Sequence, residues 1–182
     1  MAISKKTIGE TKSFMSNIFS KDSMVELPVN IENIIKEQKI DLVNYTFDDD
    51  ISGVLLLNDN HPVIGINQGH SEVRKRFTIA HELGHFILHK DNGNELFMDK
   101  MLFRRASTDY SEKDLRLEAE ANYFAANLLM PESAIKEYID KEYIDNNRVV
   151  DFYEDDDIDR MAKAFLVSSS AMNYRLINLG LR

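Results

Sequence analysis

Hydrophobic and polar positions divide the chain into a strand-rich first half and a helical second half. Short apolar runs over 41–47, 51–57 and 61–67 carry the branched residues typical of strands, and the letters NDNHP predict a hairpin between the last two. Residues 95–108 leave room for one more extended segment. Strands that come first and helices that follow indicate the α+β class. Helical periodicity and capping residues predict helices within 1–27 and over 31–38, 71–89, 112–130, 132–142 and, in the tail, two helices that break around 167–169.

The chain has 182 residues, the length of one domain with a core of its own. We expect a single domain over 1–182, made of an N-terminal extension (1–27), a core (28–150) and a helical tail (151–182). The tail opens on the acidic run DFYEDDDIDR, residues 151–160. A calcium loop is conceivable in this run, but it lacks the spaced ligands and the central glycine of an EF-hand. The preferred interpretation is a solvated loop that brings acids to a helix N-terminus.

The stretch RFTIAHELGHFILH, residues 76–89, carries the clearest candidate chemistry. His81 and His85 lie one helical turn apart, so both imidazoles can converge on one zinc ion. Glu82 cannot reach the same ligand position, but it lies where it can accept a proton from a water bound to that ion. The alternative is a helix whose two histidines have no chemical role, because HExxH motifs also arise by chance. On a helical wheel Thr78 joins this polar side, and the broad remaining face is apolar: Phe77, Ile79, Ala80, Leu83, Gly84, Phe86, Ile87 and Leu88.

A third ligand must be a histidine or a carboxylate, since the chain has no cysteine. His89 lies eight residues after His81, about 12 Å further along a helix axis, and cannot bind the same ion. His61 and His70 fall in predicted turns. A carboxylate is therefore the best candidate, and the helix over 112–130 offers Glu112, near its start, Glu118 and Glu120.

Within that helix, Glu118 lies at the edge of the apolar face and is the candidate third ligand. Asn122 is one turn further on, where its amide can orient a ligand histidine through the ring nitrogen that does not bind metal. A polar residue with no such task is the alternative for Asn122. Glu120 falls on the opposite side of the helix and is expected in solvent. Small residues would let the two helices approach each other closely: Gly84 on the first, Ala121 and Ala125 on the second.

The charge of the chain argues against nucleic acid as its partner. The 22 basic and 31 acidic side chains give a formal net charge of −9, which repels phosphate backbones unless basic residues gather on one face. The tail segment MAKAFLVSSSAMNYRLINLG has the cadence of a helix-turn-helix, with Ser168–Ser170 at the start of its second helix. That helix offers a single basic residue, Arg175. We therefore expect the tail to pack or to dock a partner protein, without direct nucleic-acid binding.

Neither a secretory signal nor a membrane span is expected. Lys5 and Lys6 are not followed by an apolar segment, and no apolar run is long enough to cross a bilayer. The lack of cysteine is compatible with a reducing compartment. We expect a cytoplasmic protein with no membrane partner.

Two segments together, RFTIAHELGHFILH and EAEANYFAANLLMP, resemble the ImmA/IrrE family of zinc metallopeptidases, small gluzincin-like proteins of bacteria and their mobile elements. The resemblance runs from about Pro28 to Leu181. It implies a small zincin-like metalloprotease domain with a short antiparallel-type sheet. It also implies that Zn²⁺ is held by the two histidines and the glutamate already singled out, and that the strand over 61–67 is the edge strand that pairs with substrate. The implied ligands are His81, His85 and Glu118, with Glu82 as the catalytic base.

The resemblance also implies a function, because members of this family cut helix-turn-helix repressors that are encoded beside them. We therefore expect a zinc-dependent endopeptidase whose protein partner is such a repressor. A zinc-binding anti-repressor that acts without proteolysis, or one component of a toxin module, is the alternative, although an intact Glu82 favours an enzyme. A DNA-binding regulator is the third possibility. No residue is singled out to stabilise the oxyanion, and the possible donors are Tyr110, Tyr123, Arg104, Arg105 and His70.

Overall fold

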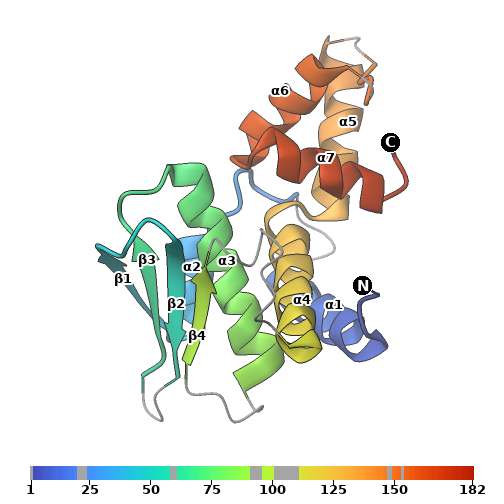
Figure 1. Ribbon diagram of the computed structural model, residues 1–182. Helices are drawn as coiled ribbons and strands as arrows, with labels where there is room; N and C mark the ends of the chain where they lie inside the picture. Colours follow the sequence, from blue (N-terminus) through green and yellow to red (C-terminus); the bar gives the residue numbers. More distant parts are fainter. Residues whose placement is uncertain are drawn as a thin grey trace.

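The computed structural model describes residues 2–19, 24–57, 61–90, 96–100, 111–146, 149–152 and 154–182. Within this part of the chain the α+β prediction is confirmed: the structure combines one four-stranded sheet with a set of helices, of which the helix over 72–89 packs on the sheet (Figure 1). The elements are, in order, α1 (Lys5–Ile18), α2 (Ile31–Glu37), β1 (Asp41–Tyr45), β2 (Ile51–Leu56), β3 (Val63–Asn67), α3 (Glu72–His89), β4 (Leu96–Lys100), α4 (Glu112–Leu129), α5 (Glu132–Asn146), α6 (Asp155–Phe165) and α7 (Ser169–Asn178).

The sheet has the strand order β1–β3–β2–β4. Strand β2 pairs antiparallel with β3 and with β4, whereas β1 pairs parallel with β3. The antiparallel hairpin partners are thus as predicted, and the extended segment expected within 95–108 is β4. The expectation that the strand over 61–67 lies at the edge is wrong. Strand β3 lies inside the sheet between β1 and β2, and four of its five residues are buried.

Helix α3 lies between the sheet and α4 (Figure 1). Its N-cap is Ser71, whose Oγ accepts a hydrogen bond from the backbone N–H of Arg74 at 3.4 Å. Both of its sides are buried, because the sheet and α4 cover it from two directions. The polar side predicted by the helical wheel therefore faces other elements of the protein, and its members are Thr78, His81, Glu82 and His85.

Helix α4 begins with a capping box, in which Ser111 and Asp114 each accept a hydrogen bond from the other's backbone N–H at 3.2 Å. Gly84 of α3 faces this helix. A Cβ at Gly84 would lie 3.1 Å from the carbonyl oxygen of Ala121 and 3.2 Å from its Cα. The missing side chain is thus what lets the two backbones come together. The apolar residues that α4 buries are Ala121, Phe124, Ala125, Leu128 and Leu129.

Helix α1 packs on α4 from the side away from the sheet (Figure 1). The rings of Phe14 and Phe124 lie 5.2 Å apart at their centroids, and Thr7 and Thr11 are buried. The N-terminal segment therefore adds a layer to the core. None of the described helices has both the length and the apolar character that crossing a membrane requires.

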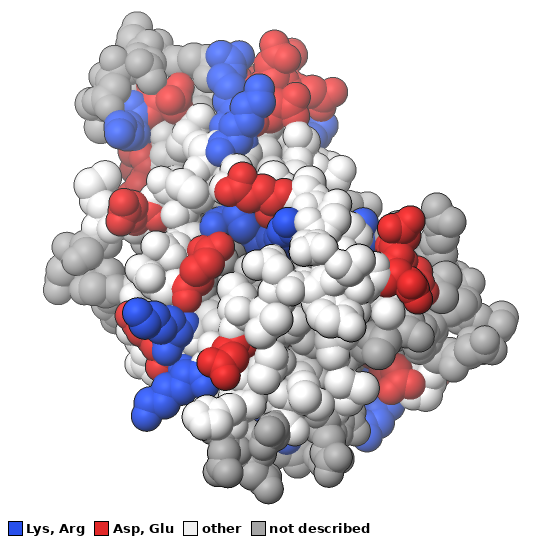
Figure 2. Space-filling model, turned by 90° about the vertical axis from the view of Figure 1, so that its left-hand side faces the viewer, with Lys and Arg blue, Asp and Glu red and all other residues white. Residues whose placement is uncertain are grey.

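The tail forms the predicted pair of helices: α6 ends at Phe165 with Leu166 as its C-cap, and Ser168 caps α7. Arg175 of α7 is buried and donates from Nε to the carbonyl oxygen of Met130 at 2.9 Å and from Nη2 to Oδ1 of Asn127 at 3.0 Å. The one basic residue of this helix therefore anchors it to α4. Among the described residues on the face shown in Figure 2, Lys and Arg are interspersed with Asp and Glu, so that face presents no basic stripe.

Candidate metal centre

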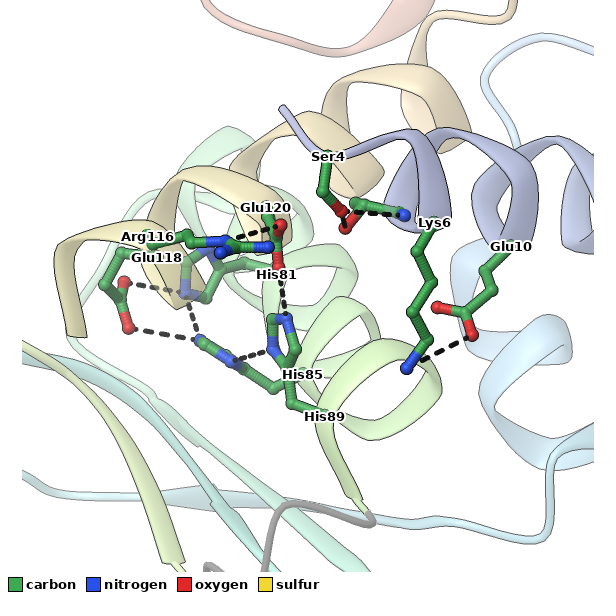
Figure 3. Close-up of polar contacts among 10 residues, drawn as sticks. Ser4, Lys6, Glu10, His81, His85, His89, Arg116, Glu118 and Glu120 are labelled. Atoms are coloured by element: carbon green, nitrogen blue, oxygen red, sulfur yellow. Dashed lines mark hydrogen bonds and ion pairs between the residues drawn. The ribbon is translucent and has the colours of Figure 1, made fainter. Parts of the chain in front are cut away.

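Two histidines of α3 and one glutamate of α4 converge on one point (Figure 3). Nε2 of His81 lies 3.2 Å from Oε2 of Glu118, and Nε2 of His85 lies 3.2 Å from Oε1 of the same carboxylate. The two Nε2 atoms are 3.1 Å apart. Among the described residues this is the group of His, Asp and Glu side chains whose ligand atoms come together as a metal site requires.

Contacts on the far side of each imidazole fix its orientation. Nδ1 of His81 lies 3.1 Å from Oδ1 of Asn122, and an amide oxygen only accepts, so this Nδ1 carries the hydrogen. Nδ1 of His85 lies 3.1 Å from Nδ1 of His89. The ring of Phe97 from β4 stacks on His85 at 4.7 Å between centroids and 22° between planes. Both Nε2 atoms thereby point at Glu118.

The donor set fits a divalent cation. With its hydrogen on Nδ1, a neutral imidazole presents a lone pair at Nε2, and an ionised carboxylate presents lone pairs only. Electron-rich atoms 3.1–3.2 Å apart repel one another unless a positive charge lies among them. Tetrahedral zinc with bonds of about 2.0–2.1 Å holds its ligand atoms about 3.3 Å from one another, close to the spacing seen here.

Burial and hydrogen bonding put these groups into the protonation states that bind metals. Burial lowers the pKa of His85 to about 4, against the opposing interaction with the carboxylate of Glu118. Burial of Glu118 would raise its pKa, but the interactions with His81 and His85 outweigh that effect and lower the pKa to about 2. At neutral pH His85 is therefore neutral and Glu118 is ionised, as ligation requires.

Glu82 is fully buried, with 0% of its surface exposed. It faces the backbone of β2, where a Cβ at Gly53 would lie 3.3 Å from Oε1 of Glu82 and 2.3 Å from Cγ2 of Thr78. A side chain at Gly53 would therefore push against both residues. The glycine gives the Glu82 carboxylate its room against β2, and Glu82 directly follows the cluster residue His81 along α3.

Glu120 is not in solvent, so that part of the sequence prediction is wrong. Its exposed fraction is 5%, because α1 packs over the side of α4 that the helical wheel had left open. Burial would raise the pKa of Glu120, but hydrogen bonds from four side chains outweigh burial and lower it. The donors are Thr7, His89, Arg116 and Ser4.

His89 and Phe97 contact the site without having been assigned a role from sequence. His89 follows His85 by four residues, and this spacing was a signal that the two rings meet. The exclusion of His89 as a ligand agrees with its position behind His85 (Figure 3). Of the possible oxyanion donors, Arg104, Arg105 and Tyr110 lie outside the described residues.

Comparison with known proteins places the chain in a family. The family model for peptidase M78, described as the IrrE N-terminal-like domain, matches residues 32–177. The chain belongs to this family, which confirms the resemblance seen in the sequence. An uncharacterized immunity region protein 2 of Bacillus phage phi105 is 28% identical over 104 residues, which cover 57% of this chain and 60% of that protein. The chain thus matches less than two thirds of the length of this relative.

A solved structure supports the fold. A Mycobacterium tuberculosis transcriptional regulator superposes with a TM-score of 0.56, covering 94% of this chain and 46% of that chain, at 16% identity. Similarity at this level of identity shows a shared fold. It says nothing about whether the two proteins share an activity.

Proposed function

We propose that the protein is a zinc-dependent endopeptidase that cleaves a helix-turn-helix transcriptional repressor at a specific site. The observation that carries this proposal is the convergence of His81, His85 and Glu118, with the buried Glu82 next to His81 in the sequence of α3. Membership of the peptidase M78 family supports the reaction class. The relative from a phage immunity region supports a regulator of mobile-element genes as the substrate.

Each side chain has a distinct task in this mechanism. His81, His85 and Glu118 would hold the zinc, which when bound lowers the pKa of a water and polarises the scissile carbonyl. Glu82 takes the proton from the attacking water and delivers it to the nitrogen of the leaving amine.

We propose that an extended substrate pairs with β4, and not with β3, the strand to which the sequence analysis gave this role. Within the described sheet β4 has a neighbour, β2, on one side only. Its Phe97 stacks on His85, so the strand runs beside the metal ligands. An extended peptide can add to such an edge by main-chain hydrogen bonds, which brings its carbonyl groups past the site.

The test is cleavage of a purified helix-turn-helix repressor, chosen as the protein encoded beside this chain. Wild-type protein with zinc should cut it at one position, and a chelator should stop the cleavage until zinc is restored. Cleavage that persists after complete removal of metal would refute the proposal. If wild-type protein never cuts but still relieves repression in cells, the binding-only anti-repressor replaces the peptidase.

A further inference from the structure

Behind His85, a line of buried side chains leads from the site into the contact between α3, α4 and α1 (Figure 3). Nδ1 of His85 lies 3.1 Å from Nδ1 of His89, and Nε2 of His89 lies 3.1 Å from Oε2 of Glu120. The exposed fractions of His85, His89 and Glu120 are 1%, 3% and 5%. Because these side chains are buried, they form their hydrogen bonds with one another.

The direction of these hydrogen bonds follows from the carboxylate at the end. An ionised Glu120 only accepts, and its Oε1 already accepts from Nε of Arg116 at 3.2 Å. Nε2 of His89 is then the donor to Oε2. A neutral imidazole has one N–H, so Nδ1 of His89 is an acceptor and Nδ1 of His85 must donate to it. Nε2 of His85 is left with its lone pair, directed at Glu118.

We propose that Glu120 and His89 are positioning residues that select the tautomer and hold the ring of His85 for metal binding. Glu120 acts on His85 through two hydrogen bonds, one from His89 to Glu120 and one between His85 and His89. The expected effect on metal affinity rests on the proposed function. The hydrogen bonds that join His85, His89 and Glu120 do not depend on it.

Helix α1 covers the Glu120 end of this series of hydrogen bonds. Its residues precede the segment that matches the family model, 32–177. Ser4 caps the helix and its Oγ lies 2.7 Å from Oγ1 of Thr7, which is 4% exposed. Thr7 and Ser4 are also among the groups whose hydrogen bonding lowers the pKa of Glu120. The docked helix thus shields the carboxylate from solvent and favours its ionised, accepting form.

The first measurement is the tautomer of each histidine in metal-free wild-type protein. Long-range ¹H–¹⁵N correlation spectra of protein labelled with ¹⁵N-histidine distinguish the two tautomers. We expect Nδ1–H for His85 and Nε2–H for His89. The reverse assignment for either ring overturns the proposal, and this result needs no variant to fold.

The second measurement compares Glu120→Gln with Arg116→Ala. The amide removes the obligate acceptor, so His85 should lose its single tautomer, and zinc affinity from competition with a chelator should fall by about 10–100-fold. Arg116→Ala removes a half-exposed partner and leaves the carboxylate, so both readouts should match wild type. A folded Glu120→Gln with wild-type tautomers and affinity overturns the proposal, as does an equal loss in Arg116→Ala.

Different results would refute the proposed metal site and the proposed positioning role of Glu120. If wild-type protein shows the expected tautomers and binds no zinc, the proposed function is refuted and the role of Glu120 in orienting His85 is supported. If wild-type protein binds zinc with the opposite tautomers, the metal site stands and the positioning role is refuted.

Discussion

Replacing Gly84 with alanine tests the close approach of α3 and α4 that builds the site. In the interior of a helix, Gly→Ala alone raises the free energy of unfolding by about 1 kcal/mol. At Gly84 the added methyl would lie 3.1–3.2 Å from Ala121 O and Cα and from Phe124 Cβ, so the neighbouring helix must move by a few tenths of an ångström. Overpacking of this kind costs about 1–3 kcal/mol.

The matched control is Gly9→Ala in α1, where an added Cβ would meet no atom within 4 Å. Gly9→Ala should raise the free energy of unfolding by about 1 kcal/mol. Gly84→Ala should leave it unchanged or lower it by up to about 2 kcal/mol, and should weaken zinc binding because Glu118 moves away with α4.

Urea unfolding of the metal-free proteins, followed by circular dichroism, measures both values. The reasoning is refuted if Gly84→Ala stabilises the protein as much as Gly9→Ala, since the two helices would then have room to spare. Unchanged zinc affinity in a destabilised Gly84→Ala would show that the strain relaxes elsewhere and leaves the ligands in place.

The remaining predictions concern pH and the tail. The pKa of His85 is lowered from 6.5 to about 4 on folding, so the unfolded chain binds more protons between these values. The stability of metal-free protein should therefore fall as pH drops from 6.5 toward 4, by at most about 1.4 kcal/mol per pH unit for this group; unfolding midpoints that stay constant over that window would contradict it. Arg175→Met should lower the free energy of unfolding by about 1–3 kcal/mol, because it leaves the buried carbonyl of Met130 without its donor. Wild-type urea stability in Arg175→Met would mean that the tail is held by its apolar contacts alone.

The sequence predicts the helices and the ligand cluster because both depend on local spacing. The four-residue interval of His81 and His85 and the position of Glu118 on its own helix specify which atoms can meet. The close pairing of α3 and α4 also follows from small residues visible in the sequence.

Predictions that depended on tertiary neighbours were the ones that went wrong. A helical wheel describes one helix in isolation, and it assigned Glu120 to solvent because the docking of α1 is not a local property. The edge position given to 61–67 failed for a related reason, since strand order is set by long-range pairing. The near-continuous apolar run VIGI was a signal for an interior strand, because a strand covered on both faces lacks alternation.

The account depends most directly on Glu82 as the base of a metal-dependent hydrolysis. Glu82→Gln keeps the size of the side chain and removes its basicity, so it should retain one zinc per chain while the rate of repressor cleavage falls by about 10²–10⁴. The measurement is the single-turnover cleavage rate of wild type and Glu82→Gln at equal zinc content. A variant that carries zinc and cuts the repressor as fast as wild type would contradict the role of Glu82 and the mechanism built on it.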